Sequence, residues 1–147
     1  MFGFAILAIL VLVAIFAPLI APFDPARQAL DNALQPPSWL HLAGTDEFGR
    51  DIFSRLVYGT RITIQTVLSV SVIVGPIGLA IGVMAGFFGG RTDAILMRAT
   101  DIVLSFPSLV LALAFAAAMG AGLGTAIIAI SLTAWPPIAR LARAEAL

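Results

Sequence analysis

The chain has 147 residues, of which 61% are hydrophobic and only 11% are charged, with eight basic and eight acidic side chains. A soluble domain has about 45–50% apolar and about 25% charged residues, so this composition predicts an integral membrane protein, and the apolar runs described below predict that it is all-α. The balanced charge gives no indication of a nucleic-acid partner. Because the chain has no cysteine, disulfides and thiolate metal ligands are excluded.

Residues 2–20 form the first predicted membrane crossing. The run carries no charge, and at about 1.5 Å per residue it spans roughly 28 Å, close to a hydrocarbon core of about 30 Å. A cleaved signal peptide is the alternative, but the run lacks a basic region before it and is long for an apolar h-region. We therefore interpret it as a retained helix, followed by a proline-rich linker over residues 21–43. The single histidine, His41, is interpreted as a surface residue.

The next stretch, residues 44–61, is the most densely charged part of the chain. Asp46 and Arg50, and then Asp51 and Arg55, are acid–base pairs at i,i+4, and apolar residues repeat at the same spacing. This pattern predicts a short amphipathic helix at a membrane–water boundary, with a turn at Gly59 after it. An ordinary solvated helix of a connecting loop is an equally open alternative.

The second predicted crossing covers residues 62–85. Gly78, Gly82 and Gly86 form a small-xxx-small row on one face of this helix, and such a row lets a second helix approach closely. Glycine is also frequent in membrane helices, so packing is favoured over gating. A tight turn is expected at residues 86–93.

The third predicted crossing runs from about residue 94 to residue 119. Arg98 and Asp101 stand at i,i+3 near its start and are predicted to pair with each other, because an unpaired charge near lipid is costly. Pro107 is predicted to kink the helix. The kink can mark a transport pathway, or the helix can simply bend around its neighbours.

The fourth predicted crossing, residues 125–139, is expected to break at Pro136 and Pro137. A charged, helix-forming stretch follows with no capping signal at its end, and we interpret the chain as truncated in mid-helix. Four crossings place both termini on one side. Arginine counts on the two sides are equal, and the shorter loops favour cytoplasmic termini.

The charged stretch, taken as residues 42–62, resembles the signature ahead of the second helix in C-type permease subunits of dipeptide, oligopeptide and nickel ABC importers. Residues 85–90, 93–109 and 135–145 resemble three further blocks of the same family in the expected order. The resemblance covers essentially the whole chain, and four ordered blocks together are specific.

This resemblance implies about four transmembrane helices of a type I ABC importer permease bundle in a prokaryotic plasma (inner) membrane. The implied partners are a second permease subunit, two cytoplasmic ATPases and an extracytoplasmic substrate-binding protein. The implied cargo is a peptide, nickel or a related small solute. The chain has no lysine and no glycine-rich phosphate loop, so ATP hydrolysis is expected on the partners. Glu145 belongs to the lead-in of the ATPase-docking loop, so this chain alone is not expected to couple to an ATPase.

Three domains are predicted: an N-terminal helix and linker (1–43), the amphipathic signature helix (44–61) and a partial transmembrane domain (62–147). A fragment of a secondary transporter and a non-transporting helix bundle are the alternatives. No catalytic, cofactor-binding or metal-binding residue is expected. The candidate site residues are the signature Gly44, Thr45, Asp46, Gly49, Arg50, Asp51 and Arg55; the packing residues Gly78, Gly82 and Gly86; the cytoplasmic-end pair and kink Arg98, Asp101 and Pro107; and the lead-in residues Arg140, Arg143 and Glu145.

Overall fold

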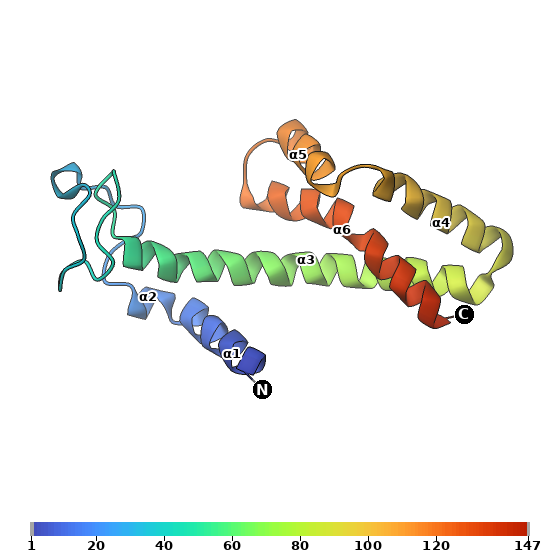
Figure 1. Ribbon diagram of the computed structural model, residues 1–147, viewed down its shortest axis with the longest axis horizontal. Helices are drawn as coiled ribbons and strands as arrows, with labels where there is room; N and C mark the ends of the chain where they lie inside the picture. Colours follow the sequence, from blue (N-terminus) through green and yellow to red (C-terminus); the bar gives the residue numbers. More distant parts are fainter. Residues whose placement is uncertain (1, 147) are drawn as a thin grey trace. The chain divides into compact units, whose positions relative to one another are not determined.

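The computed structural model describes residues 2–146, and over this range the chain is helical, with no extended strands (Figure 1). This agrees with the predicted all-α class. The elements in order are α1 (Phe2–Ile15), α2 (Ala17–Ile20), the 3-10 helix η1 (Leu30–Asn32), α3 (Ile52–Phe88), α4 (Gly90–Ser105), α5 (Ser108–Met119) and α6 (Leu123–Ala146). The chain divides into two compact units, Met1–Gln65 and Thr66–Leu147, and α3 contributes to both.

In the first unit, the predicted N-terminal crossing is divided into two helices. α1 has 14 residues and is therefore about 21 Å long, which is shorter than a hydrocarbon core of about 30 Å. The division falls at Phe16, and the short helix α2 follows with a proline in its first turn. Pro18 has no N–H to donate to the helix, so it interrupts the hydrogen-bond ladder near this point.

The predicted amphipathic helix over residues 44–61 is wrong in its first half. Residues 44–51 form a tight loop closed by an antiparallel bridge between Thr45 and Asp51, and helix begins only at Ile52. Gly44 and Gly49 have φ angles of +75° and +69°, a left-handed conformation that does not fit inside an α-helix. The expected turn at Gly59 is also absent, because α3 continues through it. Residues 21–43 contain only η1, as expected of a linker.

Within residues 2–146, two helices are long and apolar enough to cross a membrane, namely α3 and α6. α4 and α5 add a third crossing if the two helices together form one broken span, and their axes bend by 84° at the break. The break contains Pro107, so the predicted kink is a sharp bend. The residue before a proline is restricted to extended conformations, and Phe106 has φ −92° and ψ 140°.

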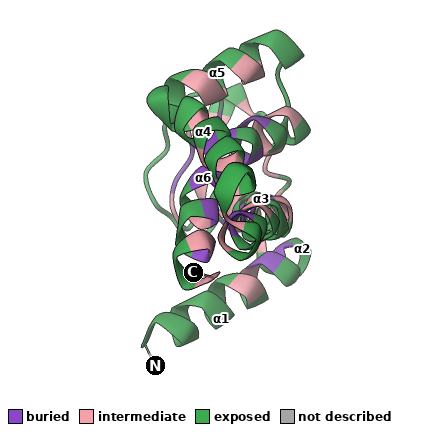
Figure 2. Ribbon diagram, turned by 90° about the vertical axis from the view of Figure 1, so that its right-hand side faces the viewer, coloured by how far each residue is buried: buried purple, intermediate pink, exposed green. Residues whose placement is uncertain are grey.

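The helix α6 contradicts the predicted break at Pro136 and Pro137, because it continues through both prolines to Ala146. Pro136 is among the largest fully buried side chains, so packing against neighbouring helices holds the backbone helical despite the lost hydrogen bonds. Figure 2 shows buried residues along α6, whereas α5 has none. The buried residues of α6 are Ala129, Ser131, Thr133, Pro136, Ala139 and Ala142.

Candidate functional site

The loop before α3 is organised around the carboxylate of Asp46. It accepts hydrogen bonds from the backbone N–H groups of Phe48 (2.9 Å) and Arg50 (3.0 Å), from Arg50 Nε (2.7 Å) and from the guanidinium of Arg55. Burial raises the pKa of Asp46, but these bonds outweigh it, with the backbone N–H of Arg50 foremost, and the pKa falls to about 2. Asp46 therefore remains ionised and joins the loop to the first turn of α3.

A second carboxylate, Asp51, connects the linker to the start of α3. Asp51 is almost fully buried. It accepts a hydrogen bond from the backbone N–H of Ser54 (2.7 Å) and lies 3.0 Å from Nδ1 of His41. Burial raises the pKa of Asp51, but hydrogen bonds from Ser54 and His41 keep it below its usual range. The hydroxyl of Ser54 in turn accepts the N–H of Phe23 (3.1 Å), 31 residues earlier in the chain.

These contacts revise the expected pairing of the charged stretch. The Asp46–Arg50 pair forms, but within a loop rather than on a helix. The Asp51–Arg55 pair does not form, because Asp51 contacts His41 and Arg55 contacts Asp46. The interpretation of His41 as a surface residue is wrong, since it is 7% exposed and its ring lies 4.9 Å from that of Phe23.

Thr45 and the two glycines close the same loop. Thr45 accepts a hydrogen bond from the backbone N–H of Gln35 (2.8 Å) and donates one to the carbonyl of Asn32. At Gly49, a Cβ would overlap the backbone of Ala29. The backbones of the linker and the loop therefore lie too close together for a side chain at this position.

The arrangement of Ser54, His41 and Asp51 is structural rather than catalytic. In a catalytic triad the hydroxyl would bond the imidazole nitrogen that faces away from the aspartate, but the Ser54 hydroxyl binds the N–H of Phe23. Among residues 2–146, no group of three or more His, Asp or Glu side chains is placed to hold a metal ion. The hydrogen bonds of these three residues attach the linker, residues 21–43, to the start of α3.

The glycine row of α3 lies against α6. A Cβ on Gly78 would come 2.7 Å from Cβ of Ile138, one on Gly82 would come 2.6 Å from Cβ of Ala142, and one on Gly86 would come 2.7 Å from Cβ of Ala146. The three glycines thus face a row of α6 residues four apart in sequence. Contact at this distance requires residues without side chains on α3.

Two ion pairs hold α4 to α6. Arg143 binds both carboxylate oxygens of Asp93, with Nε on Oδ1 and a terminal nitrogen on Oδ2 at 2.6 Å. Arg140 binds Asp101 at 2.5 Å, and both side chains of this pair are more than half exposed. The predicted Arg98–Asp101 pair is therefore not formed, and Arg98 is exposed on α4. Glu145 is also exposed, near the end of α6.

Sequence reasoning missed Asp93, His41 and Ser54 as parts of these networks. The Asp93–Arg143 pair joins residues 50 apart, and no local period connects such positions. Ser54 did carry a signal, because it stands three residues after Asp51 at the start of a helix. That spacing suits a cap in which the aspartate accepts the N–H of the third helical residue.

These features define an α-helical membrane protein, and comparison with known families identifies its type. Residues 1–37 match the N-terminal TM domain of oligopeptide transport permease C, and residues 78–147 match the binding-protein-dependent transport system inner membrane component. The chain therefore carries regions similar to two domains of binding-protein-dependent transport permeases. It is accordingly a multi-pass inner-membrane protein.

Its curated relatives are permease proteins. The chain is 47% identical to the probable D,D-dipeptide transport system permease protein DdpC of Escherichia coli, over 97% of this chain and 48% of the relative. It is 44% identical to the di/tripeptide transport system permease protein DppC of Pseudomonas aeruginosa, over 97% and 49%. It is 40% identical to the nickel transport system permease protein NikC of Escherichia coli, over 94% and 50%. The chain thus spans about half the length of the curated relatives it matches.

Proposed function

We propose that the chain forms part of the substrate pathway of an ATP-driven, binding-protein-dependent importer of peptides, or of nickel or related small solutes. The observation that carries this proposal is the similarity to peptide and nickel permeases over nearly the whole chain. In this proposal two ATPase subunits hydrolyse ATP in the cytoplasm. A second permease subunit completes the pathway, and an extracytoplasmic binding protein delivers the substrate.

The proposed topology has four crossings: α1 with α2, α3, α4 with α5, and α6. Residues 2–20 include both α1 and α2 and are uncharged. In the proposed topology the two helices cross the membrane together, as one span that is interrupted at Phe16. An even number of crossings places the termini together, and we assign them to the cytoplasm. The loop before α3 is then extracytoplasmic, and Arg140, Arg143 and Glu145 lie at the cytoplasmic end of α6, near the ATPase-docking region.

Cysteine labelling tests this topology directly, because the chain has no native cysteine. Single cysteines at Leu34 and at Arg91, which are both exposed, are to be treated with a membrane-impermeant maleimide in intact cells. We expect label on the Leu34→Cys variant and none on the Arg91→Cys variant until the cells are opened. The reverse pattern would place the termini outside and overturn the assignment.

The transport activity is tested by deleting the gene that encodes this chain and measuring uptake of labelled dipeptide, oligopeptide and nickel. We expect uptake of one of these solutes to fall to background and to return with the wild-type gene. Uptake should stop when ATP is depleted and persist when only the proton gradient is collapsed. Unchanged uptake of all three solutes would reject the proposal, and dependence on the proton gradient alone would favour a secondary transporter.

A further inference from the structure

The face of α4 that points away from α6 carries two arginines, and the proposed transport function gives them no role. Arg91 and Arg98 are both exposed, and they lie seven residues apart, on the same side of the helix. Ile95 and Ile102 continue the stripe and are 68% and 63% exposed. At 100° per residue, these four side chains fall within about 60° of one another around the helix axis.

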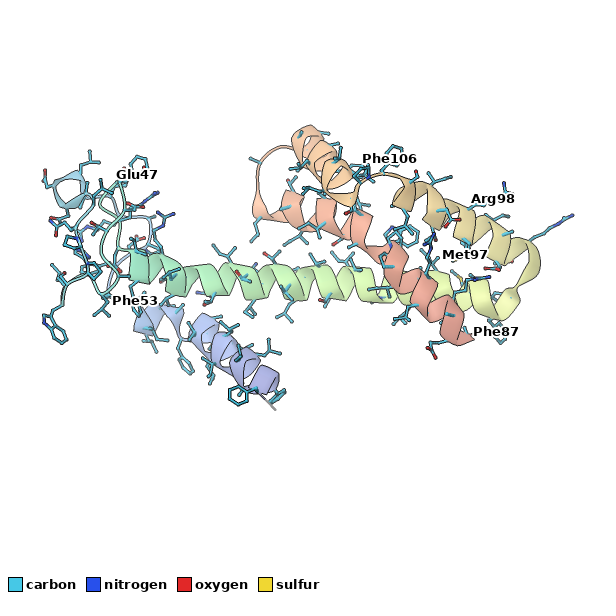
Figure 3. The ribbon with its side chains drawn as sticks, in the orientation of Figure 1. Glu47, Phe53, Phe87, Met97, Arg98 and Phe106 are labelled. Carbon is cyan, nitrogen blue, oxygen red and sulfur yellow. The ribbon has the colours of Figure 1, made fainter. Side chains whose placement is uncertain are left out.

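The opposite face of α4 is the one that packs against α6. Asp93 and Asp101 bind Arg143 and Arg140 of α6, and Thr100 is fully buried. The acidic side chains of α4 are therefore neutralised by α6. On the other face, Arg91 and Arg98 form no ion pair with an acidic side chain of residues 2–146. Figure 3 shows Met97 and Arg98 on different sides of α4, with Met97 toward α6.

The surroundings of this stripe are apolar. Phe87 and Phe88, in the last turn of α3 just before α4, are 77% and 67% exposed. An unpaired arginine is costly in hydrocarbon, so arginines on membrane helices extend their guanidinium groups to the headgroup layer while their stems remain among acyl chains. At the edge of the headgroup layer, anionic lipids attract the guanidinium groups, while the arginine stems and the isoleucines lie among the acyl chains.

We propose that the stripe formed by Arg91, Ile95, Arg98 and Ile102 is a binding site for an anionic phospholipid. The two guanidinium groups bind the headgroup phosphate, and the isoleucines contact an acyl chain. An anionic lipid is preferred because its headgroup has no positive group that would repel the arginines. An acidic surface of a partner protein is the rival occupant. The lipid is favoured because Ile95, between the arginines, and Ile102, beyond them, are exposed apolar side chains that a solvated acidic surface does not complement.

The test measures the binding of single phosphatidylglycerol and phosphatidylcholine molecules to the purified full chain by native mass spectrometry at low salt. Each arginine at an anionic surface contributes about a fivefold preference, so the R91Q/R98Q variant should lose its preference for phosphatidylglycerol by about twenty- to thirtyfold. The matched control is R27Q, which removes an exposed arginine outside α4 and should keep the preference. Thermal unfolding in phosphatidylcholine should be the same for all three proteins.

A second variant separates headgroup recognition from contact with the acyl chain. The I95S/I102S variant should weaken the binding of both lipids to a similar extent and leave their ratio unchanged. An unchanged ratio in R91Q/R98Q, or an equal loss of preference in R27Q, would overturn the proposal. An unchanged ratio together with loss of a co-purifying protein subunit would assign the stripe to a protein contact instead. None of these outcomes depends on which solute the protein transports.

Discussion

Arg143 of α6 binds both carboxylate oxygens of Asp93 in the first turn of α4, although the two residues are 50 positions apart in the sequence. Two parallel hydrogen bonds between a guanidinium and a carboxylate fix direction as well as distance. Close to this pair, three residues on successive turns of α6, namely Ile138, Ala142 and Ala146, face the glycine row of α3. The end of α6 is therefore held by two helices at once.

The first prediction concerns this pair. We expect D93N and R143Q each to lower the thermal stability of the purified protein by a few degrees, and the double variant to lower it by less than the sum. The reason is that either change alone leaves a charge without its partner. Differential scanning fluorimetry in one detergent measures all three. R98Q is the matched control, because Arg98 has no such partner, and it should leave the stability unchanged. Strictly additive losses would contradict the pairing.

The second prediction concerns close contact between α3 and α6. G82A should destabilise the protein by about 1–3 kcal/mol, because the added methyl would overlap α6 and force the helices apart. Gly75 lies on the same helix, and a Cβ added there would meet nothing within 4 Å, so G75A should be neutral or stabilising by up to about 1 kcal/mol. Denaturant titration in detergent micelles compares the two. Equal effects would show that Gly82 has no special packing role.

Features that depend on composition or on a single helical period could be predicted from the sequence. The membrane class follows from the apolar content, and the row of glycines follows from their spacing of four. The charged stretch was ambiguous, because an aspartate and an arginine at i,i+4 fit both a helix and a loop in which Asp46 accepts backbone N–H groups. Gly44 and Gly49 were the signal against a helix. The Asp93–Arg143 and His41–Asp51 contacts depend on tertiary packing, and no local pattern predicts them.

The third prediction follows from the low pKa of Asp46. Its folded value of about 2 lies below the value of 3.8 for a free aspartate. Its contribution to the stability of the loop is therefore fully present above about pH 4 and is lost as the pH falls toward 2. A nitroxide on the exposed Glu47, introduced as Glu47→Cys, reports the mobility of the loop. We expect constant mobility between pH 5 and 8 and a rise below pH 4.

The D46N variant provides the control for this titration. It lacks the ionisable carboxylate, so the nitroxide should already be more mobile at neutral pH and should not titrate with the same midpoint. A mobility transition that is the same in the D46N variant and in the parent would show that another group controls the loop.

The last prediction concerns the 84° bend between α4 and α5. Pro107 keeps Phe106 extended and removes a backbone donor, so P107A should allow helix to extend through the break. Spin labels on the exposed positions Ile95 and Leu113 measure the change by pulsed EPR. A straight helix would place the two backbones about 27 Å apart, several Å more than across the bend, and we expect the distance to shift toward that value. P76A is the matched control, because α3 is already continuous through Pro76, and labels at Val72 and Val83 should keep their separation. An unchanged Ile95–Leu113 distance in P107A would mean that contacts of α4 and α5 with α6, and not the proline, maintain the bend.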